Sequence, residues 1–477
     1  MRLNLQKFNC NILIVNTFFF FLFLSSFSIS AQNEKLIIQK ILLSGNKRTL
    51  DNTIKRELTF HENDTLQLKD LDKIIQFNKS RILGTGIANQ ININLKNWDT
   101  ESGKTDVLVE IKEAIFLYPI PIAELADRNF NVWIKEQKAS ISRLNIGTYT
   151  YWLNASGRAE LMKFTLLFGY TNKFEFNYIQ PALNTKRTIG INLNLHYSSS
   201  KELGYDTQNN KLVFKRLNEP AIQKQKYTVG VFYRPEVFTN HTFSISYQKN
   251  NISDSIINSY NEDFLGKSIH QNYFSAKYQL DIDKRNLKVF ATKGFKISTY
   301  LQKDGIFEQD DLNRIIWGIG GEKYWALSQK WNIDLKMKAQ LTHYFNDKIP
   351  YYTNKALGYE KDYLRGYEYY VVDGQKYYWG KTNLKYLILD KIIHWGKIMP
   401  IPKLRNMPVQ FFPSLNFDAG YVDNKLQKAS NYLQNTFLFS YGFGWNTLLY
   451  NNKLIQIEYS INHLNEKALF LHYDIGF

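Results

Sequence analysis

The chain has 477 residues, 16% of them aromatic, and a formal net charge of +17 at pH 7. After residue 31 no apolar run approaches the ~20 residues that a membrane-spanning helix needs. The positive charge is spread along the chain without a basic cluster, which argues against nucleic acid as a partner. The one cysteine, Cys10, lies near the N-terminus, so the rest of the chain has no disulfide and no thiolate metal site.

The N-terminal segment has the order of a secretory signal peptide. Arg2 and Lys7 supply a positive start, an apolar run covers residues 12–24, and small residues between Ser28 and Ala31 offer a cleavage site. A membrane anchor is the alternative, but the apolar run is short for a spanning helix. We therefore expect residues 1–31 to be a signal peptide and the chain to be exported.

Residues 32–114 are predicted to form a small soluble α+β domain. Apolar residues at strand or helix spacing give the element order β-α-α-β-β. The expected elements are a strand at 36–43, a helix through Leu50, Ile54 and Leu58, a helix at about 68–83, and strands at 91–95 and 107–111. The following stretch Tyr118-Pro119-Ile120-Pro121 is expected to be a stiff joint to the next domain.

Residues 115–477 alternate apolar and polar side chains with period two, which is typical of strands with one apolar face. Clear examples lie at 173–178, 191–197, 242–248, 331–338 and 455–462. In a closed membrane barrel only every second residue faces lipid, which reconciles many aromatic residues with a mean hydropathy of -0.37. At ~10 residues per strand this region predicts a transmembrane all-β barrel of about sixteen antiparallel strands. A soluble sandwich is the alternative, which the export signal disfavours.

The last predicted strand ends on an aromatic residue. Its apolar positions are Leu469, Leu471, Tyr473, Ile475 and Phe477, and they alternate with more polar neighbours. A terminal aromatic residue on such a strand resembles the C-terminal recognition signal of outer-membrane barrels. Tyr473, Ile475 and Phe477 are the candidate residues of this signal.

Two further motifs carry a resemblance to a known family. Leu364-Arg365-Gly366-Tyr367 matches the V/L-R-G-F/Y motif of the Omp85 superfamily, and Phe417-Asp418-Ala419-Gly420 matches its F-x-D-x-G motif. The N-terminal β-α-α-β-β unit, with Leu43-Ser44-Gly45-Asn46 after its first strand, resembles a POTRA domain. The mature chain is thus similar to a short, single-POTRA form of this superfamily.

The resemblance implies how a loop is held in the lumen. Arg365 would stand at the tip of a long loop folded into the barrel, and Asp418 on the wall would accept its guanidinium bidentately. Gly366 would let the backbone turn sharply, and Tyr367 would stack against the inner wall. We expect the loop to have a poor apolar core, so that this ion pair determines its position.

The chain also departs from the family pattern after the loop. Lys385 and Leu387 stand where relatives commonly carry an acid and an arginine. One usual partner of the loop arginine is therefore expected to be missing, which places more weight on Asp418.

The resemblance implies an outer-membrane protein of Gram-negative cells, with its POTRA domain in the periplasm, that inserts proteins into the membrane or translocates polypeptides. A passive pore or surface scaffold with the same fold is the alternative. The expected partners are outer-membrane lipid (lipopolysaccharide and phospholipid), unfolded polypeptide or lipoprotein clients, and accessory periplasmic proteins that bind the POTRA domain. The histidines form no close ligand pair and no enzyme motif is complete, so we expect no catalytic residue, metal or cofactor.

Overall fold

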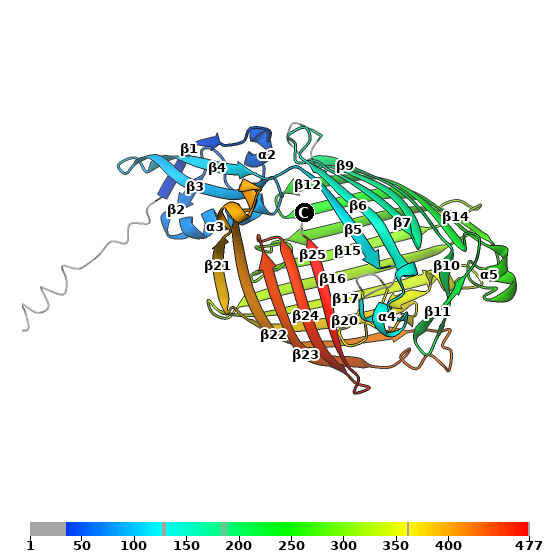
Figure 1. Cartoon of the computed structure of the whole chain (residues 1–477). Coiled ribbons are helices and arrows are strands. Elements are labelled where there is room, and N and C mark those ends of the chain that lie inside the picture. The colour runs from blue at the N-terminus through cyan, green and yellow to red at the C-terminus, as the bar shows by residue number, and fades with distance from the viewer. Residues whose placement is uncertain are drawn as a thin grey trace, which may run out of the picture.

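The computed structural model describes residues 35–125, 130–181, 183–184, 186, 188–359 and 362–475. The expected signal peptide and Phe477 lie outside these ranges. A small N-terminal domain lies at one end of a large barrel (Figure 1). Among the described residues, no helix has the length and apolar character needed to cross a membrane.

The N-terminal domain is a four-stranded sheet with two helices. The strand order is β2-β1-β4-β3, with β1 parallel to β4 and the other pairs antiparallel. Its elements are β1 (Lys35–Ser44), α2 (Asp51–Lys55), β2 (Thr65–Gln67), α3 (Leu71–Leu83), β3 (Ala88–Asp99) and β4 (Lys104–Glu113). The β-α-α-β-β order is confirmed. Strand β2 was not predicted, because its three residues are too few to show alternation.

The core of this domain lies between the helices and one face of the sheet. Both helices and three of the strands contribute buried apolar side chains, among them Ile38, Ile54, Ile82, Ile93, Val107 and Val109. Leu58, the last residue of the expected first helix, is buried as predicted although α2 itself is shorter. Among the residues that the structure describes, edge strand β3 pairs on one side only, with β4.

The barrel wall has sixteen strand positions within the described ranges, and neighbouring strands with a continuous register are antiparallel. Strands β20 (Lys376–Tyr386) and β21 (Leu389–His394) pair successively with β22 and so share one position. The other strands are β5 (Leu117–Leu125), β6 (Leu144–Leu153), β7 (Leu161–Gly169), β8 (Thr171–Gln180), β9 (Ile189–Ser200), β12 (Ile222–Glu236), β13 (Thr239–Ile252), β14 (His270–Asp283), β15 (Gly294–Asp304), β16 (Arg314–Ala326), β17 (Trp331–Tyr344), β22 (Asn406–Asp423), β23 (Leu438–Leu449), β24 (Lys453–Asn462) and β25 (Lys467–Ile475).

Smaller elements lie mostly at the barrel end remote from the N-terminal domain (Figure 1). They are α4 (Phe130–Lys135), the hairpin of β10 (Glu202–Gln208) and β11 (Lys211–Arg216), and α5 (Asp254–Ser259). The loop after β17 contains the short strands β18 (Lys355–Leu357) and β19 (Val372–Asp373).

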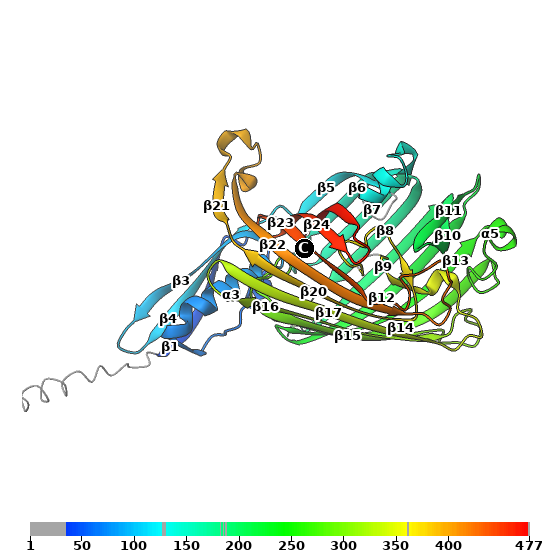
Figure 2. The ribbon, with the colours of Figure 1, turned by 90° about the horizontal axis from the view of Figure 1, so that it is seen from below.

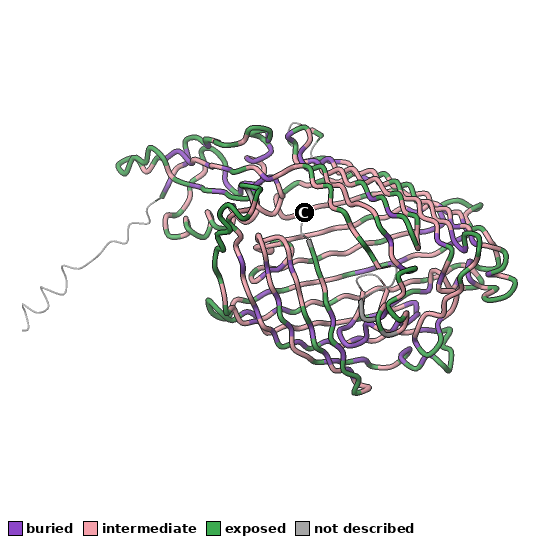
Figure 3. Tube along the Cα trace, in the orientation of Figure 1, coloured by how far each residue is buried: buried purple, intermediate pink, exposed green. Residues whose placement is uncertain are grey.

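The barrel is apolar outside and polar inside, as a barrel in lipid must be. On β22, Leu415 and Phe417 are exposed while Asn416 and Asp418 between them are buried in the lumen. Buried and exposed positions mix along the whole wall (Figure 3). Other exposed apolar residues of the wall include Ile245, Trp317, Trp445 and Leu471, and other buried polar ones include Ser440, Asn446, Glu458 and Ser460.

The expected stiff joint is wrong: Tyr118-Pro119-Ile120-Pro121 belongs to β5, the first barrel strand. β5 pairs with β6 along its whole length, from Leu117↔Trp152 to Leu125↔Leu144. Proline lacks an N–H group and is therefore usually kept out of central strands. The two prolines are two residues apart, so both missing N–H groups would lie on the same edge of β5. The opposite edge keeps all of its N–H donors.

Candidate functional site

The loop between β17 and β20, residues 345–375, turns back into the barrel. Its stem is the antiparallel pair β18–β19, in which Lys355 pairs with Asp373 and Leu357 with Val372. The segment 364–367 at its tip contacts residues of β22, β23 and β24. Gly366 has a φ of +80°, a backbone conformation that residues with a side chain rarely adopt. This conformation turns the chain at the tip.

Arg365 and Asp418 form a buried ion pair at the centre of this contact. The Arg365 Nε lies 3.0 Å from both carboxylate oxygens, and Nη2 also donates to Oδ1. The backbone N–H of Arg365 donates to Oδ2 at 3.0 Å. The exposed fractions of the two side chains are 6% and 0%. The structure thus brings together the two residues that the motifs pair.

Two partners of Arg365 were missed by the sequence analysis. Nη1 donates to the Asn383 side chain on β20 and lies 3.4 Å from Glu458 Oε1 on β24. Alternation marks both residues as lumen-facing, but the same is true of many polar residues in the wall. Glu458 therefore supplies a second carboxylate to the Arg365 guanidinium.

A second polar cluster connects the loop to the last strand. Nε2 of His472 on β25 lies 3.2 Å from Glu368 of the loop and 3.5 Å from Glu458. The ligand atoms of these three residues lie within 4.8 Å of one another, a spacing that could hold a metal ion. Because Arg365 already compensates the negative charge of Glu458, we infer that the cluster of Glu368, Glu458 and His472 holds the loop in place and does not bind a metal ion.

The remaining tip residues contact the wall as follows. The Tyr367 hydroxyl donates to the Phe439 carbonyl at 2.8 Å, and its ring stacks on His463 at 5.7 Å between centroids. Asn462 donates to the Gly366 carbonyl at 2.8 Å. Tyr369 packs on Phe470 of β25. The tip is thus held by four consecutive strands, β22 to β25.

The expectation of a poor apolar core for the loop is wrong. Leu364 and Tyr367 are buried in a cluster that combines loop and wall side chains. Its members are Ala356, Leu357, Leu364, Tyr367, Tyr370, Val372, Tyr377, Val422, Leu433 and Leu438. A Cβ at Gly420 would lie 2.8 Å from Leu364 Cδ1, so the glycine of the F-x-D-x-G motif makes room for this core.

A turn enters the lumen from the opposite end, beside the N-terminal domain. This turn, residues 284–293, joins β14 to β15, and Phe290 packs on Phe412 with a centroid distance of 5.0 Å. Lys385 donates to the Ala291 carbonyl at 3.1 Å and pairs with Asp334 at 2.7 Å. Leu387 packs against the same cluster. The two residues that depart from the family pattern therefore hold this turn.

The expected C-terminal signal lies on β25. Tyr473 is exposed on the outer face together with Leu469 and Leu471, while Phe470 is buried on the lumen side. Ile475 is the last residue of the strand, and Phe477 lies outside the described residues.

Comparison with known proteins agrees with this architecture. A family model described as surface antigen variable number repeat (POTRA) matches residues 36–114, and one described as Omp85 superfamily domain matches residues 154–384. The chain belongs to the Omp85 superfamily. Its N-terminal domain is a POTRA domain, and its barrel is of the outer-membrane type. Members of this superfamily insert or secrete proteins and are not enzymes.

Solved structures share the fold at low sequence identity. BamA from Haemophilus ducreyi lacking POTRA domains 1-3 has a TM-score of 0.52 and 14% identity, over 92% of this chain and 84% of that one. CdiB from Escherichia coli has a TM-score of 0.55 and 10% identity, over 93% and 76%. No curated protein matches this chain in sequence.

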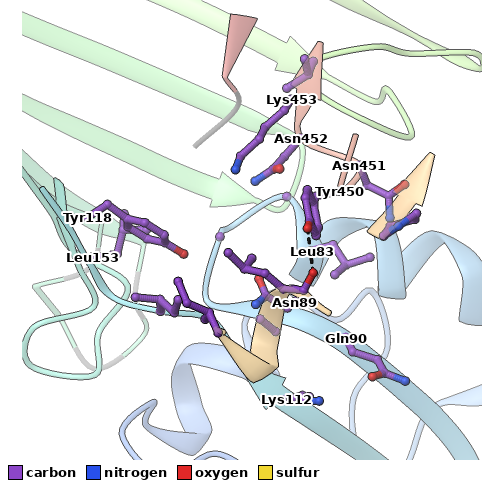
Figure 4. Close-up of a pocket in the computed structure, with 18 of the residues that line it drawn as sticks. Leu83, Asn89, Gln90, Lys112, Tyr118, Leu153, Tyr450, Asn451, Asn452 and Lys453 are labelled. Carbon is purple, nitrogen blue, oxygen red and sulfur yellow. Dashed lines mark hydrogen bonds between the residues drawn. The ribbon is translucent and has the colours of Figure 1, made fainter. Parts of the chain in front are cut away.

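A cavity of about 590 Å³ lies between the POTRA domain and the barrel rim. In Figure 4, Tyr118 and Leu153 come from the barrel, and Leu83, Asn89 and Gln90 from the POTRA domain. Tyr450, in the turn after β23, donates to the Leu404 carbonyl at 2.8 Å. The lining is largely apolar, and its charged members within the described ranges are three lysines: Lys112, Lys288 and Lys453.

An ionic contact fixes the POTRA domain on the barrel. Glu57 pairs with Arg234 of β12 at 2.9 Å and with Arg81 of α3 at 3.1 Å. Burial alone would raise the pKa of the Glu57 carboxyl, but Arg234 and Arg81 outweigh burial and lower it to about 2. Thr53 also donates to the Gly157 carbonyl of the barrel, at 2.9 Å.

Proposed function

We propose that this protein inserts proteins into the outer membrane or passes polypeptides across it, with its POTRA domain in the periplasm. The observation that carries the proposal is the position of an open strand edge. Edge strand β3 begins at Ala88, and residues 88–90 line the cavity beside the barrel strands β5 and β25. An exposed edge is a template for adding an extended strand of another chain.

The cavity suits an extended client with alternating side chains. Its apolar lining, which includes Leu117, Ile120 and Tyr473, can accept every second side chain. Strand β3 can supply backbone hydrogen bonds that do not depend on the client sequence. The Glu57 contact keeps this edge at the rim, so a captured strand would already lie beside the barrel wall.

A passive pore or surface scaffold remains the competing function. An open pore requires a continuous water path through the barrel. Loop 345–375 occupies the lumen at one end, and Phe290 of turn 284–293 is buried in it at the other. This double occupancy supports client handling over free diffusion through the lumen.

Photocrosslinking in cells tests the proposal. A photoreactive phenylalanine at Asn89 or Gln90 should crosslink to newly exported outer-membrane or secreted proteins. The control position is Glu101, in the exposed hairpin turn at the other end of β3. Crosslinks of equal yield from Glu101, or none from 89 and 90, would contradict client capture at this edge.

A further inference from the structure

A hairpin projects from the barrel rim at the POTRA end. It consists of β21, the connection that follows, and the first part of β22, and we call residues 388–411 the rim hairpin. Its strands pair from Leu389↔Phe411 to His394↔Asn406. Figure 2 shows it standing clear of the barrel wall. All residues from 390 to 398 are exposed.

The exposed side chains of the rim hairpin are unusually apolar for a connection. Ile388, Ile392 and Ile398 have exposed fractions of 59%, 57% and 84%. Trp395 and Ile401 are exposed as well. A contiguous apolar surface of this kind marks a contact with a membrane or another protein. Connections on this side of membrane barrels are usually short turns, so the hairpin is an addition that needs an explanation.

The register of β22 decides which face of the hairpin is apolar. Odd-numbered residues of this strand, such as Leu415 and Phe417, point outward from the barrel. The pairing of β22 with β23 is unbroken from Val409 to Gly420, so parity is preserved along β22, although β20 and β21 are offset from each other by one residue. The odd positions of the hairpin and their partners are Phe411, Val409, Met407, Leu389, Lys391 and Ile393. Of these, Lys391 and Ile393 are exposed, whereas Val409 is buried. The lipid-facing surface therefore continues onto the hairpin.

The charge of the hairpin favours a particular surface. Residues 388–405 contain three lysines and one arginine against a single acid, Asp390. Asp390 accepts a hydrogen bond from Gln410 across the hairpin. Basic residues beside apolar ones, with a tryptophan among them, are typical of segments at the interface of a membrane with anionic lipid.

We propose that the rim hairpin is an interfacial anchor that binds phospholipid of the leaflet on the POTRA side. Ile393 on the lipid-facing side of the hairpin, together with Trp395 and Ile398 of its connection, enters the boundary between headgroups and acyl chains, and Lys391 and Lys397 contact anionic headgroups. Ile401, Pro402, Leu404, Asn406 and Pro408 of the same hairpin line the cavity described above. Anchoring would therefore hold the cavity at the membrane surface. The proposal requires that the barrel lies in a membrane and does not depend on client handling.

The test uses the mature chain, which has no native cysteine. Ile398→Cys and, as control, Ser102→Cys on the exposed POTRA hairpin turn are labelled with an environment-sensitive NBD fluorophore. The proteins are reconstituted in vesicles of phosphatidylethanolamine and phosphatidylglycerol. We expect blue-shifted emission at 398, quenched by lipids with bromine on the acyl chains, and water-like emission at 102. Equal emission at both positions, or a shift at 398 only after an envelope protein is added, would overturn the proposal.

A second comparison isolates the charge. Lys391→Gln with Lys397→Gln should weaken the quenching at 398 several-fold in vesicles with phosphatidylglycerol. The same change should have no effect when phosphatidylcholine replaces the anionic lipid. The matched control is Lys69→Gln with Lys73→Gln, two exposed lysines of the POTRA domain. If the control pair weakens the quenching at 398 equally, the hairpin lysines do not bind the anionic headgroups. Heat-modifiable migration in gels verifies that each variant is a folded barrel.

Discussion

Arg365 and Asp418 show how a single buried contact can determine the place of a long loop. Removing one partner leaves a buried charge without compensation, which costs about 3–5 kcal/mol, whereas removing both avoids that penalty. We expect Arg365→Ala and Asp418→Ala each to lower barrel stability and activity. The double variant should be no worse than the worse single one, as a double-mutant cycle of denaturant unfolding would measure. Effects that simply add would show that the loop is not held this way.

A second residue-scale prediction concerns Gly420. The Cβ of Gly420→Ala would lie 2.8 Å from Leu364 Cδ1 and 3.1 Å from the Tyr378 carbonyl. Such overpacking should cost about 1–3 kcal/mol, measured by denaturant unfolding in detergent. Gly321→Ala is the matched control, because a Cβ there meets nothing within 4 Å. The idea fails if both alanine variants are equally stable, or if Leu364→Ala does not relieve part of the Gly420→Ala defect.

The motifs named the main pair of the candidate site but not the complete network. Asn383 and Glu458 could not be selected, because many polar side chains face the lumen and alternation treats them alike. The partner of Lys385 was hidden for another reason. Besides Asp334, Lys385 contacts the Ala291 carbonyl, and a local sequence pattern does not indicate that a turn enters the lumen.

At the scale of elements, turn 284–293 should shield the lumen at the POTRA end. Phe290→Ala removes its packing on Phe412, Leu448 and Leu454, a loss of about 3–5 kcal/mol if the site does not collapse. Ser414, opposite Lys385 in the strand register, is buried nearby. We expect a maleimide to label Ser414→Cys faster when Phe290→Ala is present. Phe345→Ala, which changes an exposed residue at the start of loop 345–375, serves as control. Unchanged labelling would mean that the turn does not shield this site.

The element predictions succeeded where a repeated pattern was long and failed where it was short or interrupted. Strands β8, β9, β13, β17 and β24 each contain an alternating run that the sequence shows clearly. The three-residue strand β2 offers no period. Strand β5 was not predicted, because Pro119 and Pro121 are typical of extended linkers. The strand forms because its neighbours in the barrel stabilise it.

At the scale of the whole molecule, Glu57 connects two domains through a titratable contact. Its pKa in the folded protein is about 2, below the ordinary value of 4.5. A lowered carboxyl pKa stabilises docking above pH 4.5, and this contribution declines as the pH falls toward 2. The full shift of the Glu57 pKa corresponds to a stabilising free energy of roughly 3 kcal/mol.

We therefore expect POTRA docking to loosen in acid and to be weak at all pH values in Glu57→Gln. Distances between spin labels at Glu101 and on the barrel would measure docking. Glu62→Gln is the control, because Glu62 is an exposed POTRA carboxylate that pairs with Lys55 within the same domain. Distances that do not change with pH or with the Glu57 substitution would show that other contacts suffice.

Composition and alternation led to the correct architecture, because a membrane barrel imposes one rule on every strand. Function is less accessible, since the same fold serves proteins that insert and proteins that secrete. The features that bear on function meet at the rim: an open POTRA edge, a cavity and an apolar hairpin. These elements lie far apart in the sequence, and folding alone brings them together.

Depletion of the protein in cells tests the central claim most directly. Quantitative proteomics of the outer membrane and the medium would be compared before and after depletion. We predict that a defined set of outer-membrane or secreted proteins declines, and that the wild-type chain restores it whereas Arg365→Ala, present at equal amount in the membrane, does not. An unchanged set of proteins after depletion would contradict client handling and favour a pore or scaffold.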